Sequence, residues 1–252
     1  MFIAIPELSQ IPFIAHGFTL KKLENGQNFD FDLRNRNQAQ KNFLKVINFI
    51  GAKKSSIITC RQVHSNKIIK FDPLKPDPHK YREIEGDALI TNQPNVTIAV
   101  ITADCLPILL IDKKEKAIGA IHAGRKGTMM SIVKAAIENM KIYFNTMPEN
   151  LIVGIGPGIQ KCCYEVDKTI ADQFEKKIKH SNQVVIPNPK NKLKHTIDLL
   201  EANLGQLIEK NVLYKNIFVM DYCTSCRNDL FFSYRADKIK TGRMLGFIML
   251  KD

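Results

Sequence analysis

Apolar residues recur along several segments of the chain at the spacing of an amphipathic helix. Residues 37–50 (NQAQKNFLKVINFI) show this spacing and stop before Gly51, a residue that commonly follows the end of a helix. Residues 127–144 (GTMMSIVKAAIENMKIYF) carry the clearest apolar stripe, which predicts one helix packed on the core. We expect two further helices, over residues 169–180 and 197–210.

Short apolar runs rich in β-branched residues and bounded by turn signals predict buried strands. These runs cover 11–20, 55–63, 66–71, 87–91, 96–111, 116–123, 151–156, 217–223, 230–234 and 245–250. Residues 72–86 contain three prolines and many charges, which predicts an exposed loop. Because strands and helices alternate without a repeat or linker, we expect a single α/β domain, 1–252, with mixed sheets covered by helices.

Composition narrows the class of protein. The chain has 252 residues, 44% of them hydrophobic, which allows a large buried core. No run approaches the roughly 18 uncharged apolar residues of a membrane span, and Glu7 and Pro12 interrupt the N-terminus in a way that argues against a secretory signal. Six irregularly spaced cysteines do not form a disulfide scaffold pattern. We therefore expect a cytoplasmic protein.

The net charge of +12 raises the question of nucleic-acid binding. The 37 basic residues are mostly lysines spread along the chain. Nucleic-acid readers usually concentrate basic residues on one face and favour arginine. The pattern therefore favours solvated surface, and a basic cleft would also suit a small substrate that carries phosphate.

Three segments, RQVHSN, TADCLP and HAGRKG, each place a histidine or cysteine at or near the end of a predicted strand. These residues are His64, Cys105 and His122. Zinc favours imidazole and thiolate ligands, and a catalytic zinc site generally keeps one position open for water or substrate. The separations match no local zinc-finger pattern, so from spacing alone core packing stays the commoner explanation for Cys105 and His122.

Two carboxylates neighbour these segments. Asp104 precedes Cys105, and Asp87 follows Gly86. Either could orient a ligating imidazole or accept a proton, while a turn-forming role is an equal interpretation for Asp87.

The remaining cysteines carry weaker signals. Cys223-Thr-Ser-Cys226 has the spacing of a redox pair or of half a zinc site, but no second pair of that spacing accompanies it. We expect a packed or substrate-lining role for this pair. Adjacent Cys162 and Cys163 are expected to be structural.

Taken in order, several segments resemble the successive signatures of the YfiH family, also described as the polyphenol-oxidase or laccase-domain family and as purine nucleoside phosphorylases. The segments are RQVHSNKI, GDALIT, TADCLPILL, IHAGRKG, VGIGPGIQKCCYEV and FFSYRADKIKTGRMLGFI. The resemblance implies a zinc ion bound by His64, Cys105 and His122. It also implies a four-layer α-β-β-α architecture with mixed sheets, likened to a cysteine-hydrolase domain.

The resemblance further implies phosphorolysis of adenosine, inosine and methylthioadenosine, with adenosine deamination alongside. Partners would be a small-molecule purine nucleoside and phosphate, with no membrane or nucleic acid. We take Asp104 and Cys105 as the catalytic candidates. An anion site beside the ribose requires cations, and the substrate-binding candidates are Arg61, Arg125, Lys126 and Arg235. The family usually reads HAGWRG where this chain reads HAGRKG, a difference that falls on the substrate contacts near Arg125.

Other functions stay open on the residues alone. Cys105 could be a nucleophile with His122 as base, acting on an amide. The family resemblance implies peptidoglycan-precursor editing as one such reaction. A copper-dependent phenol oxidase is a weaker alternative, because a multicopper enzyme needs many more histidines than the six present. A basic nucleic-acid-binding protein with a structural zinc would need a fourth ligand, such as Cys223 or Cys226.

Overall fold

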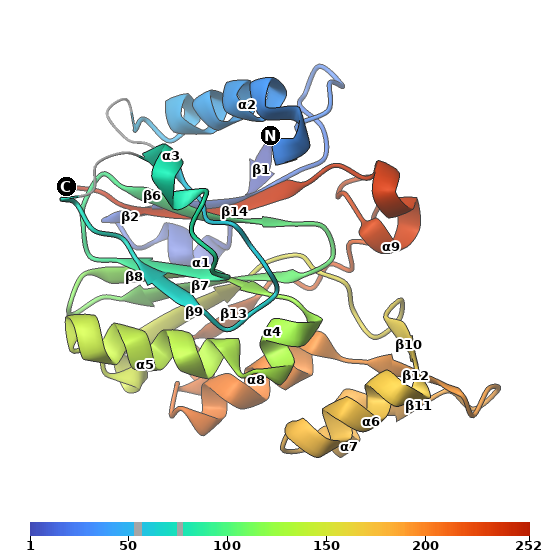
Figure 1. Cartoon of the computed structure of the whole chain (residues 1–252). Helices are drawn as coiled ribbons and strands as arrows, with labels where there is room; N and C mark the ends of the chain where they lie inside the picture. The colour runs from blue at the N-terminus through green and yellow to red at the C-terminus, as the bar shows by residue number, and fades with distance from the viewer. Residues whose placement is uncertain (53–56, 75–77) are drawn as a thin grey trace.

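Two mixed β-sheets stack at the centre of the protein in the computed structural model, which describes residues 1–52, 57–74 and 78–252 (Figure 1). The five-stranded sheet has the order β1 (Phe2–Ile3), β2 (Ile14–Thr19), β14 (Met244–Leu250), β6 (Thr97–Thr102) and β3 (Ile57–Ile58). The six-stranded sheet has the order β13 (Ile217–Val219), β9 (Leu151–Ile155), β7 (Leu106–Asp112), β8 (Ala117–Ala123), β5 (Ala88–Thr91) and β4 (Ile68–Lys70).

Both sheets mix parallel and antiparallel pairs. β3 runs parallel to β6, while β14 pairs antiparallel with β2 and β6. In the second sheet β13–β9 and β4–β5 are parallel, and β7 pairs antiparallel with β8 and β9. A third, antiparallel sheet contains β10 (Glu165–Asp167), β12 (Lys194–Ile197) and β11 (Val185–Pro187).

Helices cover the outer faces of the two large sheets (Figure 1). α2 (Arg36–Phe49) packs on the five-stranded sheet through Phe43 and Val46. α5 (Ile132–Phe144) and α8 (Leu199–Glu209) pack on the six-stranded sheet. The shorter helices are α1 (Pro6–Ser9), α3 (Pro78–Tyr81), α4 (Arg125–Met129), α6 (Lys168–Lys177), α7 (Ser181–Val184) and α9 (Tyr234–Asp237), with 3-10 turns at Leu33–Asn35, Pro148–Asn150, Tyr214–Asn216 and Lys238–Lys240.

Side-chain alternation along β7 explains why its sequence is apolar throughout. Leu106, Ile108 and Leu110 belong to the core cluster beneath α5 and α8. Leu109 and Ile111 belong to the cluster between the two sheets. Successive residues of a strand point to opposite faces, so a strand covered on both faces needs apolar residues at every position.

The helix expected over 127–144 is two helices. α4 ends at Met129, and Ser131 has a positive φ of 59°, so α5 begins only at Ile132. α4 is fastened to α8, because Gln206 Nε2 donates to the Thr128 carbonyl at 2.8 Å and Asn203 Nδ2 to the Thr128 hydroxyl at 3.0 Å. These contacts break the helix between α4 and α5, although the apolar spacing of the sequence continues through this point.

Five other expected segments need correction. The run at 96–111 is two strands, because the chain turns at 103–105 between β6 and β7. The expected strand at 230–234 is a turn leading into α9, whose first turn Ser233 caps by accepting a hydrogen bond from the Ala236 N–H. The expected loop at 72–86 contains α3 and the buried Tyr81, although 75–77 lie outside the described residues. The strands expected at 55–63 and 66–71 shorten to β3 and β4, and 55–56 also lie outside.

None of the helices in the described ranges combines the length and apolarity needed to cross a membrane.

Candidate metal centre and active-site cavity

His64, Cys105 and His122 lie together at one end of the six-stranded sheet. Cys105 immediately precedes β7, and His122 lies on β8 opposite Pro107. The Cys105 Sγ is 3.9 Å from the His64 Nε2, and the two imidazole centroids are 4.8 Å apart. One donor atom from each of the three residues lies within 4.8 Å of the others. The three predicted residues therefore converge.

A turn at Asp104 directs Cys105 towards the histidines. Asp104 has a positive φ of 87°, and its backbone carbonyl accepts a hydrogen bond from the Ile159 N–H at 2.7 Å. Its carboxylate accepts one from the Thr224 hydroxyl at 2.6 Å and another from the Arg235 backbone N–H at 2.6 Å. These bonds hold the turn, so the geometry of Asp104 suits a positioning residue better than a proton acceptor.

Asp87 is fully buried and organises both histidines. One carboxylate oxygen lies 2.8 Å from the His122 Nδ1 and accepts the His64 backbone N–H at 2.9 Å. The other accepts the Ser65 N–H at 2.6 Å, the Ser65 hydroxyl at 2.8 Å and the Val63 N–H at 3.2 Å. His64 has a positive φ of 59°, and these bonds hold its backbone there. With Nδ1 engaged, the His122 Nε2 is the nitrogen left to face Cys105.

The electrostatics of the cluster favour a thiolate beside an imidazolium. Burial acts to raise the pKa of Cys105, but the charge on His122 and hydrogen bonds from both histidines lower that pKa to about 6. Burial acts to lower the pKa of His122, yet the Cys105 charge and the Asp87 hydrogen bond raise it to about 9. Burial acts to raise the pKa of Asp87, which its bonds to His122 and Ser65 lower to about 2.

Gly124 leaves the space in which the cluster fits. A Cβ atom at this position would lie 2.8 Å from the Cys105 Sγ and 3.0 Å from the His64 Cδ2. Any larger residue would push the thiol or the imidazole out of place, so the glycine of the HAG segment is required for close approach.

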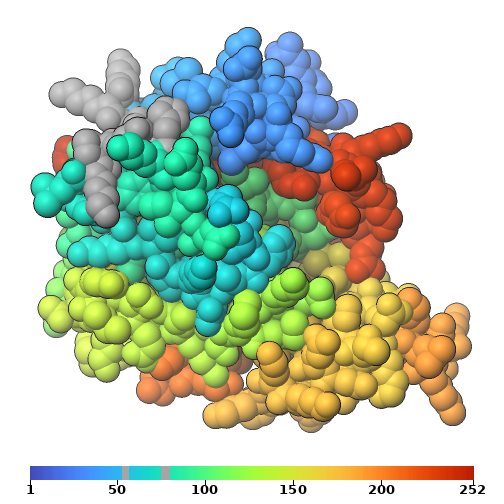
Figure 2. All heavy atoms as spheres, in the orientation of Figure 1, coloured from blue at the N-terminus to red at the C-terminus, as the bar shows by residue number. Residues whose placement is uncertain are grey.

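The cluster opens into a cavity of about 860 Å³. In the view of Figure 2, its walls come from blue residues near the N-terminus, the green α4 and the red α9. Six cationic side chains line it: Arg61, Arg82, Arg125, Lys126, Arg235 and Arg243. Among the described residues, only two carboxylates line it, those of Asp32 and Asp104. The four substrate-binding residues expected from the sequence all reach this cavity.

The cations differ in how they are held. Arg235 is fixed, because its Nη1 donates to the carbonyls of Cys163 at 3.1 Å and Glu165 at 2.9 Å. Arg61 is more exposed and pairs with Glu85 at 3.0 Å. Arg82, which lies in the expected loop, was not among the predicted substrate-binding residues. Its guanidinium stacks over the Phe43 ring at 5.0 Å, and its buried Nε finds no hydrogen-bond partner among the described residues.

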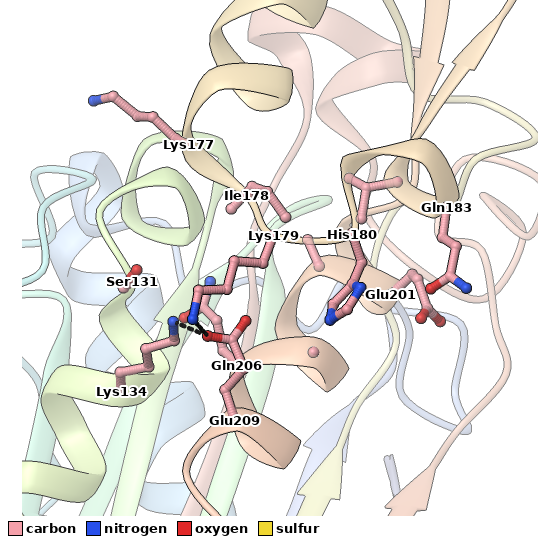
Figure 3. Close-up of a pocket in the computed structure, with 13 residues that line it drawn as sticks. Ser131, Lys134, Lys177, Ile178, Lys179, His180, Gln183, Glu201, Gln206 and Glu209 are labelled. Carbon is pink, nitrogen blue, oxygen red and sulfur yellow. Dashed lines mark hydrogen bonds and ion pairs between the residues drawn. The ribbon is translucent and has the colours of Figure 1, made fainter.

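A second, much smaller cavity of about 30 Å³ lies between α5, α8 and the segment around His180 (Figure 3). Glu209 pairs there with Lys134 at 2.6 Å and Lys179 at 3.5 Å (Figure 3). This volume is about that of one water molecule, so the cavity belongs to helix packing and not to substrate binding.

The other cysteines form a separate group. Cys223 and Cys226 lie with Cys162 and Cys163, all four sulfur atoms being within 4.8 Å of one another. No second pair of the same spacing accompanies Cys223 and Cys226, as the sequence indicates, but the fold brings the adjacent Cys162 and Cys163 to them from a distant loop. Within the described ranges, no second cysteine joins His64, Cys105 and His122 as a fourth ligand. A structural zinc closed there by Cys223 or Cys226 is therefore not supported.

Comparisons with known proteins cover almost the whole chain. Residues 20–251 match a family described as multi-copper polyphenol oxidoreductase laccase. A purine nucleoside phosphorylase from Clostridium acetobutylicum is 34% identical over 229 residues, which is 90% of this chain and 89% of that protein. An adenosine deaminase, RL5, from an unknown prokaryotic organism is 33% identical over 199 residues, covering 77% and 75% of the two chains.

Among solved structures, the Bacillus licheniformis hypothetical protein YfiH superposes with a TM-score of 0.89 at 28% identity, covering 99% of this chain and 96% of the other. YlmD from Geobacillus stearothermophilus gives a TM-score of 0.86 at 28% identity, covering 96% and 93%. The mixed α/β fold is thus shared with both.

Proposed function

Because the chain belongs to the laccase-domain (YfiH) family, we propose that it is a zinc-dependent purine nucleoside phosphorylase that also deaminates adenosine. The proposed substrates are adenosine, inosine and methylthioadenosine, each with phosphate as the second substrate. Relatives named as phosphorylase and as deaminase support both activities. The observation that carries the proposal is the convergence of one thiol and two imidazoles at the wall of a cavity lined by six cations.

The donor set fits zinc. Zinc accepts imidazole and thiolate ligands readily, and three protein ligands leave a position for substrate or water. A zinc ion bound by His64, Cys105 and His122 would supply Lewis-acid chemistry. Copper is the weaker alternative, since these three residues form the only histidine-containing cluster among the described residues.

The chain's own residues would bind and orient the substrates. A cavity of about 860 Å³ is large enough for a nucleoside and phosphate together, since small-molecule sites span roughly 300–1,000 Å³. Arg61, Arg125, Lys126 and Arg235 would hold the phosphate and the ribose. Arg235 is the best placed, because backbone carbonyls fix its guanidinium at the wall.

Asp87 would keep His122 in one tautomer and orientation. Asp104 would act on Cys105 and Arg235 by holding their backbone. Direct catalytic roles for Asp104 and Cys105 stay predictions.

The test is phosphate-dependent cleavage of adenosine by zinc-loaded protein. Chromatography should show adenine and ribose 1-phosphate only when phosphate is present, and inosine from the deamination. His64→Ala should abolish all products, whereas His180→Ala, which removes an exposed imidazole outside the cavity, should leave turnover intact. Absence of every product from the zinc-loaded protein would overturn the proposal.

A second candidate function is favoured by one specific observation. Asp87 hydrogen-bonds to His122, and the donor atoms of His122 and Cys105 lie within 4.8 Å of each other. A carboxylate, an imidazole and a thiol in this order are the groups of a cysteine hydrolase acting on an amide such as a peptidoglycan precursor. Metal-free protein that hydrolyses an amide, and loses this activity on alkylation of Cys105, would favour this function over phosphorolysis.

We further propose a four-layer architecture, a single domain and a cytoplasmic location for this protein. One core cluster lies between α2 and the five-stranded sheet, one between the two sheets, and one between the six-stranded sheet and the helices α5 and α8. This order supports a four-layer, cysteine-hydrolase-like arrangement. The family match over residues 20–251 supports one domain spanning 1–252. Six unbridged cysteines support a cytoplasmic location, and the cavity supports small-molecule partners over nucleic acid.

A further inference from the structure

Four of the six cysteines gather where two loops meet beside the wall of the cavity. We call them the four-cysteine cluster: Cys162, Cys163, Cys223 and Cys226. All four sulfur atoms lie within 4.8 Å of one another. Cys223 is buried, while Cys162 and Cys226 are exposed, so the cluster is open to ions from solvent.

Backbone bonds bring the two loops together without help from the thiols. Gly158 and Cys223 form an isolated parallel bridge. The Thr224 N–H donates to the Gly158 carbonyl at 3.1 Å, and the Gly158 N–H donates to the Tyr222 carbonyl at 3.3 Å. The fold therefore presents both pairs of sulfur atoms to a shared point.

Sulfur spacing within the four-cysteine cluster matches a tetrahedral metal site. Zinc–sulfur bonds of about 2.3 Å place the sulfur atoms of a tetrahedral site roughly 3.8 Å apart. The Cys226 Sγ lies 3.5 Å from the Cys162 Sγ and 3.3 Å from the Cys163 Sγ. Because Cys226 is almost equally close to both, the geometry singles out no disulfide pair. We propose that the four-cysteine cluster binds a structural zinc ion, distinct from the one proposed beside the cavity.

The donor set of the four-cysteine cluster suits zinc, because cysteine binds this metal as its thiolate. Four protein ligands leave no open position, which is typical of structural and not catalytic zinc.

The proposed ion would stabilise the wall that holds substrate. The Cys163 carbonyl accepts the Arg235 guanidinium, and the Thr224 hydroxyl donates to Asp104. Both residues belong to the loops that the four-cysteine cluster joins. The ion would therefore fix Arg235 and the turn before Cys105 from a distance, without contacting substrate.

The experiment is zinc analysis by plasma mass spectrometry on protein purified under reducing conditions, expressed as ions per chain. Wild-type protein should contain two zinc ions, and His64→Ala should retain one. Cys226→Ser should contain one fewer ion than wild type, whereas Cys60→Ser, which alters a cysteine outside both groups, should match wild type. Cobalt-substituted His64→Ala should show the strong sulfur-to-cobalt absorption of a site rich in thiolates.

The measurements separate this inference from the proposed function. One zinc ion in wild type that Cys226→Ser loses would support the four-cysteine cluster and contradict the site beside the cavity. Equal zinc in wild type and Cys226→Ser would overturn the inference. If Cys226→Ser does not fold, His64→Ala provides the test. His64→Ala protein that contains no zinc would overturn the inference. His64→Ala protein whose four clustered cysteines all react with a thiol reagent before any chelator is added would also overturn it.

Discussion

Replacing Asp87 by asparagine tests how the candidate metal centre is held in place. The substitution keeps the shape of the side chain but removes its charge and turns one acceptor oxygen into a donor NH₂ group. That group would face N–H or O–H donors from His64, Ser65 or His122, all of which now bond to the carboxylate. We expect the Asp87→Asn substitution to lower both the free energy of unfolding and the affinity for zinc.

The pKa shift of Asp87 sets the magnitude of the expected loss of stability. Its shift from 3.8 to about 2 corresponds to about 2 kcal/mol of stability at 1.36 kcal/mol per pKa unit. Because the folded-state pKa is depressed, this stability is fully present above pH 3.8 and is lost as pH falls towards 2. In a chain of this size, 1 kcal/mol shifts the melting temperature by roughly 2–4 °C, so we expect a decrease of roughly 4–8 °C at pH 7.

The assay is denaturant unfolding of metal-free protein from pH 7 down to pH 2, followed by zinc titration at pH 7. The difference in free energy of unfolding between wild type and Asp87→Asn should narrow below pH 4, and zinc affinity should fall about 10–100-fold. Asp112→Asn is the matched control, since Asp112 is also buried and accepts backbone N–H groups, but at the far end of β7. A stability difference independent of pH, or zinc binding equal to that of wild type, would refute the reasoning.

Three further predictions concern neighbouring residues. In metal-free protein, alkylation of Cys105 should rise with pH through about 6 because His122 stabilises the thiolate; mass spectrometry that finds the midpoint near 9 would contradict this. Gly124→Ala should weaken zinc binding in equilibrium dialysis by about tenfold or more, whereas Gly205→Ala, whose added Cβ meets nothing within 4 Å, should not; equal affinities would count against the packing argument. Arg235→Gln should raise the KM for phosphate about tenfold or more, as expected for a lost charged hydrogen bond, and an unchanged KM would remove Arg235 from the anion site.

Local patterns predicted those parts of the fold that local interactions determine. The end of α2 before Gly51 follows from a glycine with a positive φ of 72°. Buried strands such as β7 and β8 were predicted by their uninterrupted runs of apolar residues, which are too long to be turns. The break between α4 and α5 could not be predicted in this way. It depends on Asn203 and Gln206, which reach Thr128 from more than seventy residues away.

The candidate site shows the same division. Residue chemistry alone left His64, Cys105 and His122 as one interpretation among several, and the resemblance to a family singled them out. Neither approach indicated the four-cysteine cluster, because its two pairs are brought together by a backbone bridge between loops some sixty residues apart. Arg82 was missed because charge among prolines predicts a solvated loop, whereas here the side chain stacks on Phe43.

The central claim is that a zinc ion held by His64, Cys105 and His122 supports phosphorolysis of purine nucleosides. The most direct test is to titrate metal-free protein with zinc, and separately with copper, while measuring phosphate-dependent release of adenine from adenosine. We predict that release rises with zinc to a plateau in wild type and stays at background in His64→Ala. Zinc-saturated wild type that releases no base with phosphate, or activity that appears only with copper, would contradict the claim.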